Sequence, residues 1–156
     1  MEKIAVFPGS FDPFTVGHEN IVLRALDLFD RIIVAIGIHS TKQPLLKIQS
    51  RVEMVNQVFK TNEQVSVDFF EGLTVDYCKK VNATHMLRGI RTSADFEYER
   101  AIAQVNKLML PSVESVFLLT TPEHTPVNST IIRDIIRNGG DASQFLPEGV
   151  DIKKYL

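Results

Sequence analysis

Short apolar runs alternate along the chain with longer segments in which every third or fourth residue is apolar. The runs have the length of β-strands and cover residues 3–7, 31–38, 65–70, 84–88 and 113–120. The segments near 18–29, 48–59, 73–81, 95–110 and 129–138 place apolar residues at i, i+3, i+4 and i+7, the spacing of one helix face. The pattern predicts five strands, each followed by a helix.

This order of elements predicts how the strands pair. Strands that alternate with helices pair in parallel through right-handed crossovers. The run Ile32-Ile33-Val34-Ala35-Ile36 is apolar throughout, as expected for a strand covered on both faces. We therefore expect an α/β fold with a Rossmann-like, doubly wound, five-stranded parallel sheet. The length of 156 residues, 44% of them hydrophobic, fits one domain over residues 1–156.

Glycine and proline positions indicate where the last helices end. Asn138-Gly139-Gly140 predicts a left-handed cap on the helix that begins at Ser129, and Pro111 stops the helix before it. The stretch 145–150 contains Pro147 and Gly149, which break a long helix. We expect it to dock as a short tail.

Composition narrows the class of protein. With 17 basic and 19 acidic residues, a net charge of −2 and no block of like charge, we expect neither a nucleic-acid nor a membrane partner. No apolar run approaches the roughly 18 residues that cross a bilayer, and the first residues lack the pattern of a secretion signal. The expected location is the cytoplasm.

Several kinds of site are disfavoured by motifs that the sequence lacks. The single cysteine, Cys78, is expected to pack as a small hydrophobe, and the absence of HxxxH or CxxC spacings argues against a transition-metal site. His39 and His85, near strand ends, are expected to be structural. There is no GxSxG elbow and no P-loop motif.

Polar residues collect in the loops that follow the predicted strands. Ligands of parallel sheets bind at the carboxyl ends of strands, and these loops hold mainly cations and hydroxyls: Ser10, His18, Lys42, Arg88, Arg91, Glu99, Ser129 and Thr130. Residues 8–18 form a Gly-rich turn that enters a helix, a natural phosphate cradle. The set predicts a polyphosphate ligand.

Each of these residues also has a purely structural interpretation. His18, in the first turn of its helix, can cap the helix or donate to a phosphate oxygen. Lys42 can be solvated surface. One of Arg88 and Arg91 can form a salt bridge with Asp95, Glu97 or Glu99 instead of gripping phosphate. The turn 127–130 is a strong N-cap signal that accounts for one of its hydroxyls.

Three ordered blocks resemble the bacterial phosphopantetheine adenylyltransferases, within the nucleotidyltransferases that carry a T-x-G-H signature. The blocks are Pro8-Gly9-Ser10-Phe11-Asp12-Pro13 with Thr15-Val16-Gly17-His18, Arg88-Gly89-Ile90-Arg91 with Asp95-Phe96-Glu97-Tyr98-Glu99, and Glu114-Ser115-Val116-Phe117-Leu118 with Ser129-Thr130-Ile131-Ile132-Arg133. The resemblance implies reversible transfer of AMP from ATP to 4′-phosphopantetheine, giving dephospho-coenzyme A and pyrophosphate. It further implies a homo-hexamer, and Mg²⁺ carried mainly by ATP with no protein ligands.

The resemblance also implies roles for individual residues. Those implied in catalysis are His18, Ser10, Lys42 and Arg91. Those implied in binding 4′-phosphopantetheine are Ser10, Lys42, Thr74 and Arg88. Those implied in binding ATP are Ser10, Phe11, His18, Gly89, Ile90, Arg91, Glu99, His124, Thr125, Pro126, Val127, Asn128, Ser129 and Thr130.

Three positions depart from the common family pattern. Ser10 stands where Thr is usual, Asn128 where Ser is common, and His124 where Trp or Tyr is frequent. Two other functions compete with the family's reaction. One is nucleotidyl transfer by a sister enzyme to nicotinate mononucleotide or glycerol phosphate, which the block from Arg88 to Glu99 disfavours. The other is a non-catalytic sensor of a nucleotide or coenzyme A, which His18, Lys42 and Arg91 argue against.

Overall fold

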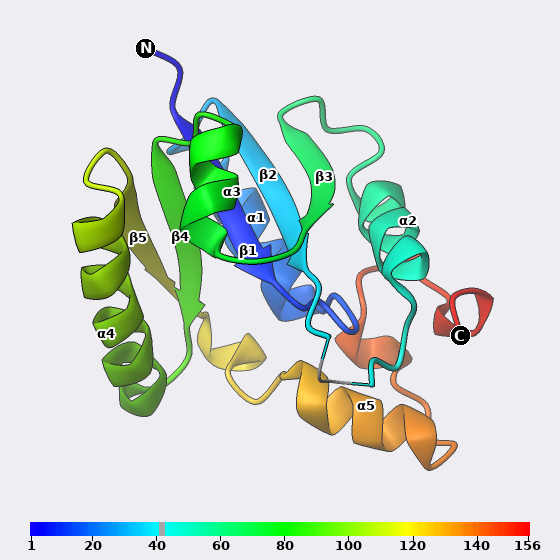
Figure 1. Cartoon of the computed structure of the whole chain (residues 1–156). Helices are drawn as coiled ribbons and strands as arrows, with labels where there is room; N and C mark the ends of the chain where they lie inside the picture. Colours follow the sequence, from blue (N-terminus) through cyan, green and yellow to red (C-terminus); the bar gives the residue numbers. More distant parts are fainter. Residues whose placement is uncertain (41–42) are drawn as a thin grey trace.

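The sheet contains five parallel strands in the order β3-β2-β1-β4-β5. The computed structural model describes residues 1–40 and 43–156 (Figure 1). The strands are β1 (Ile4–Gly9), β2 (Arg31–Gly37), β3 (Val65–Phe70), β4 (His85–Ile90) and β5 (Glu114–Leu119). The chain order reverses at β1, which lies between β2 and β4, so the carboxyl ends of β1 and β4 mark the switch point where such sheets bind ligands.

Helices cover both faces of the sheet (Figure 1). They are α1 (Val16–Ala25), α2 (Ile48–Val58), α3 (Thr74–Lys80), α4 (Ser93–Met109) and α5 (Ser129–Arg137). Alternate residues of β1 enter two different cores: Phe7 packs with residues of α1 and α2, whereas Val6 packs with residues of α3. The predicted α/β, doubly wound, five-stranded parallel sheet is confirmed.

The predicted element boundaries hold to within two residues, except at the end of α1. Helix α1 ends at Ala25, and the rest of the predicted segment is a turn that returns Phe29 to the core. At the other end, Gly139 has φ 77° and the amides of Gly139 and Gly140 bond to the carbonyls of Ile136 and Ile135, which confirms the left-handed cap. Leu110 caps α4 next to Pro111, as predicted.

The tail after α5 docks as predicted. Leu146 is buried against Ile132 and Ala142, and Val150 packs beside them. Cys78 is fully buried, and the His85 ring packs on Phe29 with centroids 5.1 Å apart. These two residues therefore have the structural roles expected of them.

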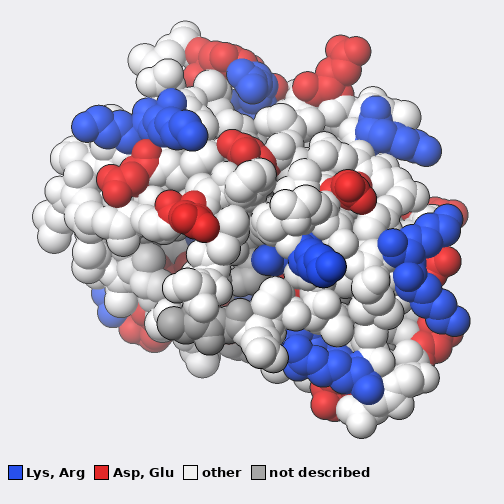
Figure 2. All heavy atoms as spheres, turned by 45° about the vertical axis from the view of Figure 1, so that its right-hand side comes forward, with Lys and Arg blue, Asp and Glu red and all other residues white. Residues whose placement is uncertain are grey.

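Helix α4 contrasts with the others because none of its residues is buried. A stripe of apolar side chains runs along it at helical spacing and is partly or largely exposed: Tyr98, Ile102, Val105 and Met109, with Leu108 beside them. On the face shown in Figure 2, basic and acidic side chains are interspersed. Within the described ranges, no helix has the length and apolar character needed to cross a bilayer.

Candidate active site

Two adjoining cavities open at the carboxyl edge of the sheet. The α5-side cavity, about 580 Å³, lies between the ends of β1 and β4 and the starts of α1 and α5. The α3-side cavity, about 450 Å³, is lined by residues that follow β2 and β3 and by α3 and α4. Both cavities are lined by Pro8, Gly9, Ser10, Arg88, Tyr98 and Glu99. The site therefore has two compartments that meet at Ser10 and Arg88.

Aromatic packing shapes the turn between β1 and α1. Phe11 adopts φ 47° and is buried, with its ring over Gly9, where an added Cβ would lie 2.8 Å from that ring. Only glycine allows this approach. The ring centroids of Phe11 and Phe14 lie 5.0 and 5.3 Å from that of His18. The turn therefore packs the imidazole of His18 against two phenyl rings.

His18 both caps its helix and lines the α5-side cavity. The Thr15 N–H donates to His18 Nδ1 at 3.0 Å, and Thr15 Oγ1 accepts from the His18 N–H. Burial, and then the charges of Arg88 and Arg91, lower the pKa of His18 to about 3. The ring is thus neutral, and because Nδ1 accepts, its proton is on Nε2. His18 can therefore donate one hydrogen bond, from Nε2, to a ligand.

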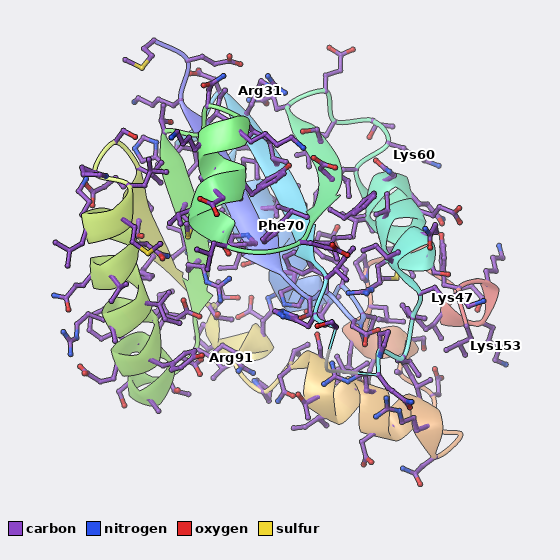
Figure 3. All side chains as sticks on the ribbon, in the orientation of Figure 1. Arg31, Lys47, Lys60, Phe70, Arg91 and Lys153 are labelled. Atoms are coloured by element: carbon purple, nitrogen blue, oxygen red, sulfur yellow. The ribbon has the colours of Figure 1, made fainter. Side chains whose placement is uncertain are left out.

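Both arginines at the end of β4 are paired with carboxylates of α4. Arg88 Nε and Nη2 donate to Glu99 at 2.9 and 2.5 Å, and Arg91 Nε donates to Asp95 at 3.3 Å. The salt-bridge interpretation therefore holds for both arginines, not for one. The reason is geometric, because α4 begins shortly after β4 and turns Asp95 and Glu99, one helical turn apart, toward the strand end. Figure 3 shows Arg91 at this carboxyl edge and Arg31 at the opposite edge.

The start of α5 is capped by an amide side chain and not, as the sequence predicts, by a hydroxyl. The N-cap is the Asn128 side chain, which accepts from the Ile131 N–H at 2.9 Å, so neither hydroxyl caps the helix. Ser129 Oγ instead donates to the Pro13 carbonyl at 2.8 Å, and Thr130 Oγ1 accepts from Arg133. Asn128 has the carbonyl oxygen of a good cap, which leaves the Ser129 hydroxyl to tie α5 to the first turn, whereas the Thr130 hydroxyl bonds within α5.

Most residues that the resemblance implies for ATP gather in one compartment. The α5-side cavity is lined by Ser10, Phe11, His18, Gly89, Arg91, Glu99, His124, Val127, Asn128, Ser129 and Thr130. Ile90, Thr125 and Pro126 are not among its lining residues. The α3-side cavity is lined by Ser10, Thr74 and Arg88, three of the residues implied for 4′-phosphopantetheine. Lys42 lies outside the described residues.

Sequence reasoning missed several residues that hold or line the site. Asp12 is buried and accepts the N–H groups of Leu45 and Leu46 at 2.8 Å, and Arg51, also buried, donates to the Ser10 carbonyl at 2.8 Å. These contacts join segments far apart in the chain, so no local sequence pattern predicts them. His39, for which the sequence predicts a structural role, is exposed and lines the α3-side cavity, because the chain leaves the sheet before that residue.

The donor set of the site suits phosphate oxygens better than a metal ion. In residues 1–40 and 43–156, no three His, Cys, Asp or Glu side chains are grouped so that they could hold a metal. The cavities instead present guanidinium, imidazole and hydroxyl groups together with the amino end of α5. This arrangement can bind polyphosphate anions in one compartment and a second anion in the other.

Known proteins place the chain in a family. A family model described as cytidylyltransferase-like matches residues 6–135. A bifunctional NMN adenylyltransferase/ADP ribose pyrophosphatase from Francisella tularensis, complexed with AMP and a Mn ion, superposes with a TM-score of 0.72 at 17% identity. The match covers 98% of this chain and 46% of that one, and it shows a shared fold alone.

Sequence relatives define the family more narrowly. The phosphopantetheine adenylyltransferase of Flavobacterium psychrophilum is 48% identical over 149 residues, which cover 96% of this chain and 98% of that protein. The phosphopantetheine adenylyltransferase of Leptospira biflexa is 46% identical, with 99% of each chain covered. The chain therefore belongs to the phosphopantetheine adenylyltransferase family of nucleotidyltransferases.

Proposed function

We propose that the two compartments separate the two substrates, with ATP in the α5-side cavity and 4′-phosphopantetheine in the α3-side cavity. As a member of its family, the chain catalyses the reversible transfer of the adenylyl group of ATP to 4′-phosphopantetheine in coenzyme A biosynthesis. The observation that carries the proposal is that both cavities are lined by Ser10 and Arg88. At these two residues, the phosphate of a substrate in the α3-side cavity would meet the α-phosphate of ATP in the α5-side cavity.

Alignment and charge stabilisation are the tasks that this reaction sets the protein. The attacking group is already an anionic phosphate oxygen, so no general base is needed. It forms a bond to the α-phosphorus as the bond to the pyrophosphate oxygen breaks. The Nε2–H of His18 would donate to an α-phosphate oxygen as charge grows on it, which fits a ring that stays neutral.

The remaining residues would divide between the two substrates. Arg91 and the amino end of α5, with Ser129 and Thr130, face the cavity where the β- and γ-phosphates of ATP would lie. Arg88 and the Ser10 hydroxyl would hold the incoming phosphate, a role that the family resemblance also gives to Lys42. Thr74, the first residue of α3, would contact the pantetheine arm.

Mg²⁺ would enter with ATP, bound to phosphate oxygens, and lower the repulsion between the two anionic substrates. We also propose that the chain acts in the cytoplasm as a homo-hexamer. The uncovered apolar stripe on α4 supports self-association, because a monomer would leave Val105, Leu108 and Met109 in water.

A turnover assay with a panel of acceptors tests the function. Purified protein with ATP and Mg²⁺ should release pyrophosphate with 4′-phosphopantetheine and much less with nicotinate mononucleotide or glycerol phosphate. Pyrophosphate release with one of the other acceptors alone would assign the chain a different acceptor. Tight binding of ATP without turnover on any acceptor would indicate a sensor.

A further inference from the structure

The α3-side cavity extends beyond the residues that it shares with the α5-side cavity. It reaches the ends of β2 and β3 and the start of α3, where it is lined by Gly37, His39, Phe70 and Thr74. None of these four residues lines the α5-side cavity. The proposed function leaves His39 without a role, although this residue is exposed at the cavity.

Strand pairing shows how this part of the cavity is laid out across the end of the sheet. Ser10 directly follows the last residue pair between β1 and β2, which brings it near Gly37. In the next pairing, Gly37 of β2 is opposite Phe70 of β3. Neighbouring strands lie about 4.8 Å apart, and Thr74 begins α3 shortly after β3 ends. The floor of the cavity therefore runs from Ser10 over Gly37 toward Thr74.

The imidazole of His39 turns back over this floor. Its Nε2 lies 3.8 Å from the place where a Cβ on Gly37 would stand, and the ring of Phe70 lies 3.6 Å from the same place. The Ile38 N–H donates to the Phe70 carbonyl at 2.9 Å, so the chain stays beside β3 until it reaches His39. Neither Gly37 nor Phe70 has a polar side chain that could bond to Nε2. The tip of the imidazole therefore faces an apolar floor.

The Phe70 ring at this floor is held in place from α3. It stacks on the ring of Tyr77, with centroids 4.9 Å apart and an angle of 22° between the planes (Phe70 is labelled in Figure 3). Tyr77 is buried, and its hydroxyl donates to the Asp68 carboxylate at 2.7 Å. These contacts join α3 to β3, so the apolar part of the floor is formed before a ligand binds.

A substrate held at both ends of this floor would pass His39. The proposed function puts a phosphate at Ser10 and the pantetheine arm at Thr74. In 4′-phosphopantetheine, the groups that follow the phosphate are two methyl groups on one carbon, then a hydroxyl and an amide. The methyl groups suit the apolar floor, whereas the hydroxyl and the amide need hydrogen-bonding partners when they leave water. An imidazole can supply a donor or an acceptor.

We propose that His39 is a specificity-determining residue for the acceptor, and that its imidazole forms a hydrogen bond with the hydroxyl or the amide that follows the phosphate. This inference rests on the proposed function for the identity of the acceptor. It assigns His39 to substrate binding and not to the bond-forming step.

Two substitutions separate the hydrogen bond from the shape of the side chain. In His39→Phe, the ring fills similar space but forms no such bond, so the KM for 4′-phosphopantetheine should rise about fivefold. In His39→Gln, the amide can donate and accept, so this KM should stay within about twofold of the wild-type value. In both variants kcat, and the Kd for MgATP measured by calorimetry without acceptor, should change less than about twofold, because the contact lies away from the reacting atoms.

Ser40→Ala is the control for disturbance of the chain after β2. Ser40 is exposed and lines neither cavity, so this variant should keep the wild-type KM. An unchanged KM in His39→Phe would overturn the proposal, as would an equal rise in Ser40→Ala or in His39→Gln. A fall in kcat as large as the rise in KM would also overturn it, because His39 would then act on the reacting phosphate.

A shortened acceptor tests which part of the arm His39 contacts. 4′-Phosphopantothenate keeps the hydroxyl and the amide next to the phosphate but lacks the thiol end. Its Ki as a competitor of 4′-phosphopantetheine should rise in His39→Phe by the same factor as the KM. An unchanged Ki would place His39 at the thiol end and overturn the proposal. A wild-type protein that releases no pyrophosphate with 4′-phosphopantetheine would instead refute the proposed function.

Discussion

His18 shows how one side chain can serve the fold and the reaction at the same time. Its Nδ1 accepts the N–H of Thr15 at the start of α1, and this bond directs the remaining proton to Nε2, on the other edge of the ring. The structural and the functional interpretations of this histidine are therefore compatible. The capping bond is what makes the ring a donor of known orientation.

Replacing His18 by alanine should lower kcat about 100-fold, because one donor to a developing phosphate charge is lost. Steady-state pyrophosphate release at saturating ATP and 4′-phosphopantetheine measures the effect. His85→Ala is the control, since His85 lines neither cavity and its kcat should stay close to that of the wild type. Unchanged turnover in His18→Ala would remove this residue from the mechanism.

The lowered pKa of His18 also predicts how stability depends on pH. The unfolded histidine titrates near 6.5 and the folded one near 3, so between these values the unfolded state binds one more proton. The contribution of His18 to the free energy of unfolding is therefore fully present above pH 6.5. It falls as the pH drops toward 3, by at most ~1.4 kcal/mol per pH unit.

Urea unfolding of the wild type and of His18→Asn at about pH 7.5 and about pH 5 isolates this contribution from the other titrating groups. The wild type should lose more stability than the variant between these two values. An equal loss in both proteins would show that His18 binds a proton as readily in the folded state as in the unfolded one.

The turn between β1 and α1 is held by several elements at once. The Asp12 carboxylate accepts from the segment that leads to α2, Arg51 of α2 donates to the Ser10 carbonyl, and Arg133 of α5 donates to the Asp12 carbonyl at 2.9 Å. Ser10 is thus placed by bonds to its backbone, which leaves its hydroxyl available to a ligand. The conformation of this turn is therefore fixed by bonds from neighbouring elements.

Asp12→Asn should lower the free energy of unfolding by about 2 kcal/mol, since an amide N–H₂ would face one of the two backbone N–H groups in a buried place. Urea unfolding measures the loss. Asp30→Asn is the matched control, because Asp30 also accepts a backbone N–H, that of Lys3 at 2.7 Å, but at an exposed position. Similar losses in the two variants would contradict the importance of burial at Asp12.

Local patterns predict the elements, and long-range contacts complete the site. The spacing of apolar residues gives all five strands and their helices, because burial on one face or two is written into neighbouring positions. The bond from Arg51 to Ser10 spans 41 positions and that from Arg133 to Asp12 spans 121, so neither leaves a local trace. The polarity of the cavities can be predicted from the loops, whereas the pairing of Arg88 and Arg91 depends on the direction of α4.

At the scale of the whole molecule, α4 is the helix whose apolar side chains the monomer leaves uncovered. It packs beside β4 and β5, yet no residue in it is buried, and its apolar stripe faces outward. Because α4 also carries Glu99 and Tyr98, which line both cavities, assembly on this face would lie close to the site. The proposed association and the proposed substrate binding would therefore involve one helix.

Leu108→Glu should dissociate the oligomer, because a charge would replace the most exposed apolar side chain of α4, which is 83% exposed. Light scattering coupled to size-exclusion chromatography measures the mass. Leu28→Glu, at another exposed leucine just after α1, should leave the mass unchanged. A monomeric wild type, or a Leu108→Glu protein of unaltered mass, would exclude this face as the interface.

The shared boundary of the two cavities has a consequence for the end of the catalytic cycle. With the substrates in the two compartments as proposed, dephospho-coenzyme A would occupy both compartments as one molecule and would be a bivalent ligand. When one half detaches, the other keeps it at a high effective concentration, and rebinding competes with escape. The product should therefore bind more tightly than either AMP or 4′-phosphopantetheine alone. Its slow dissociation, more than bond formation, should then limit the rate of turnover.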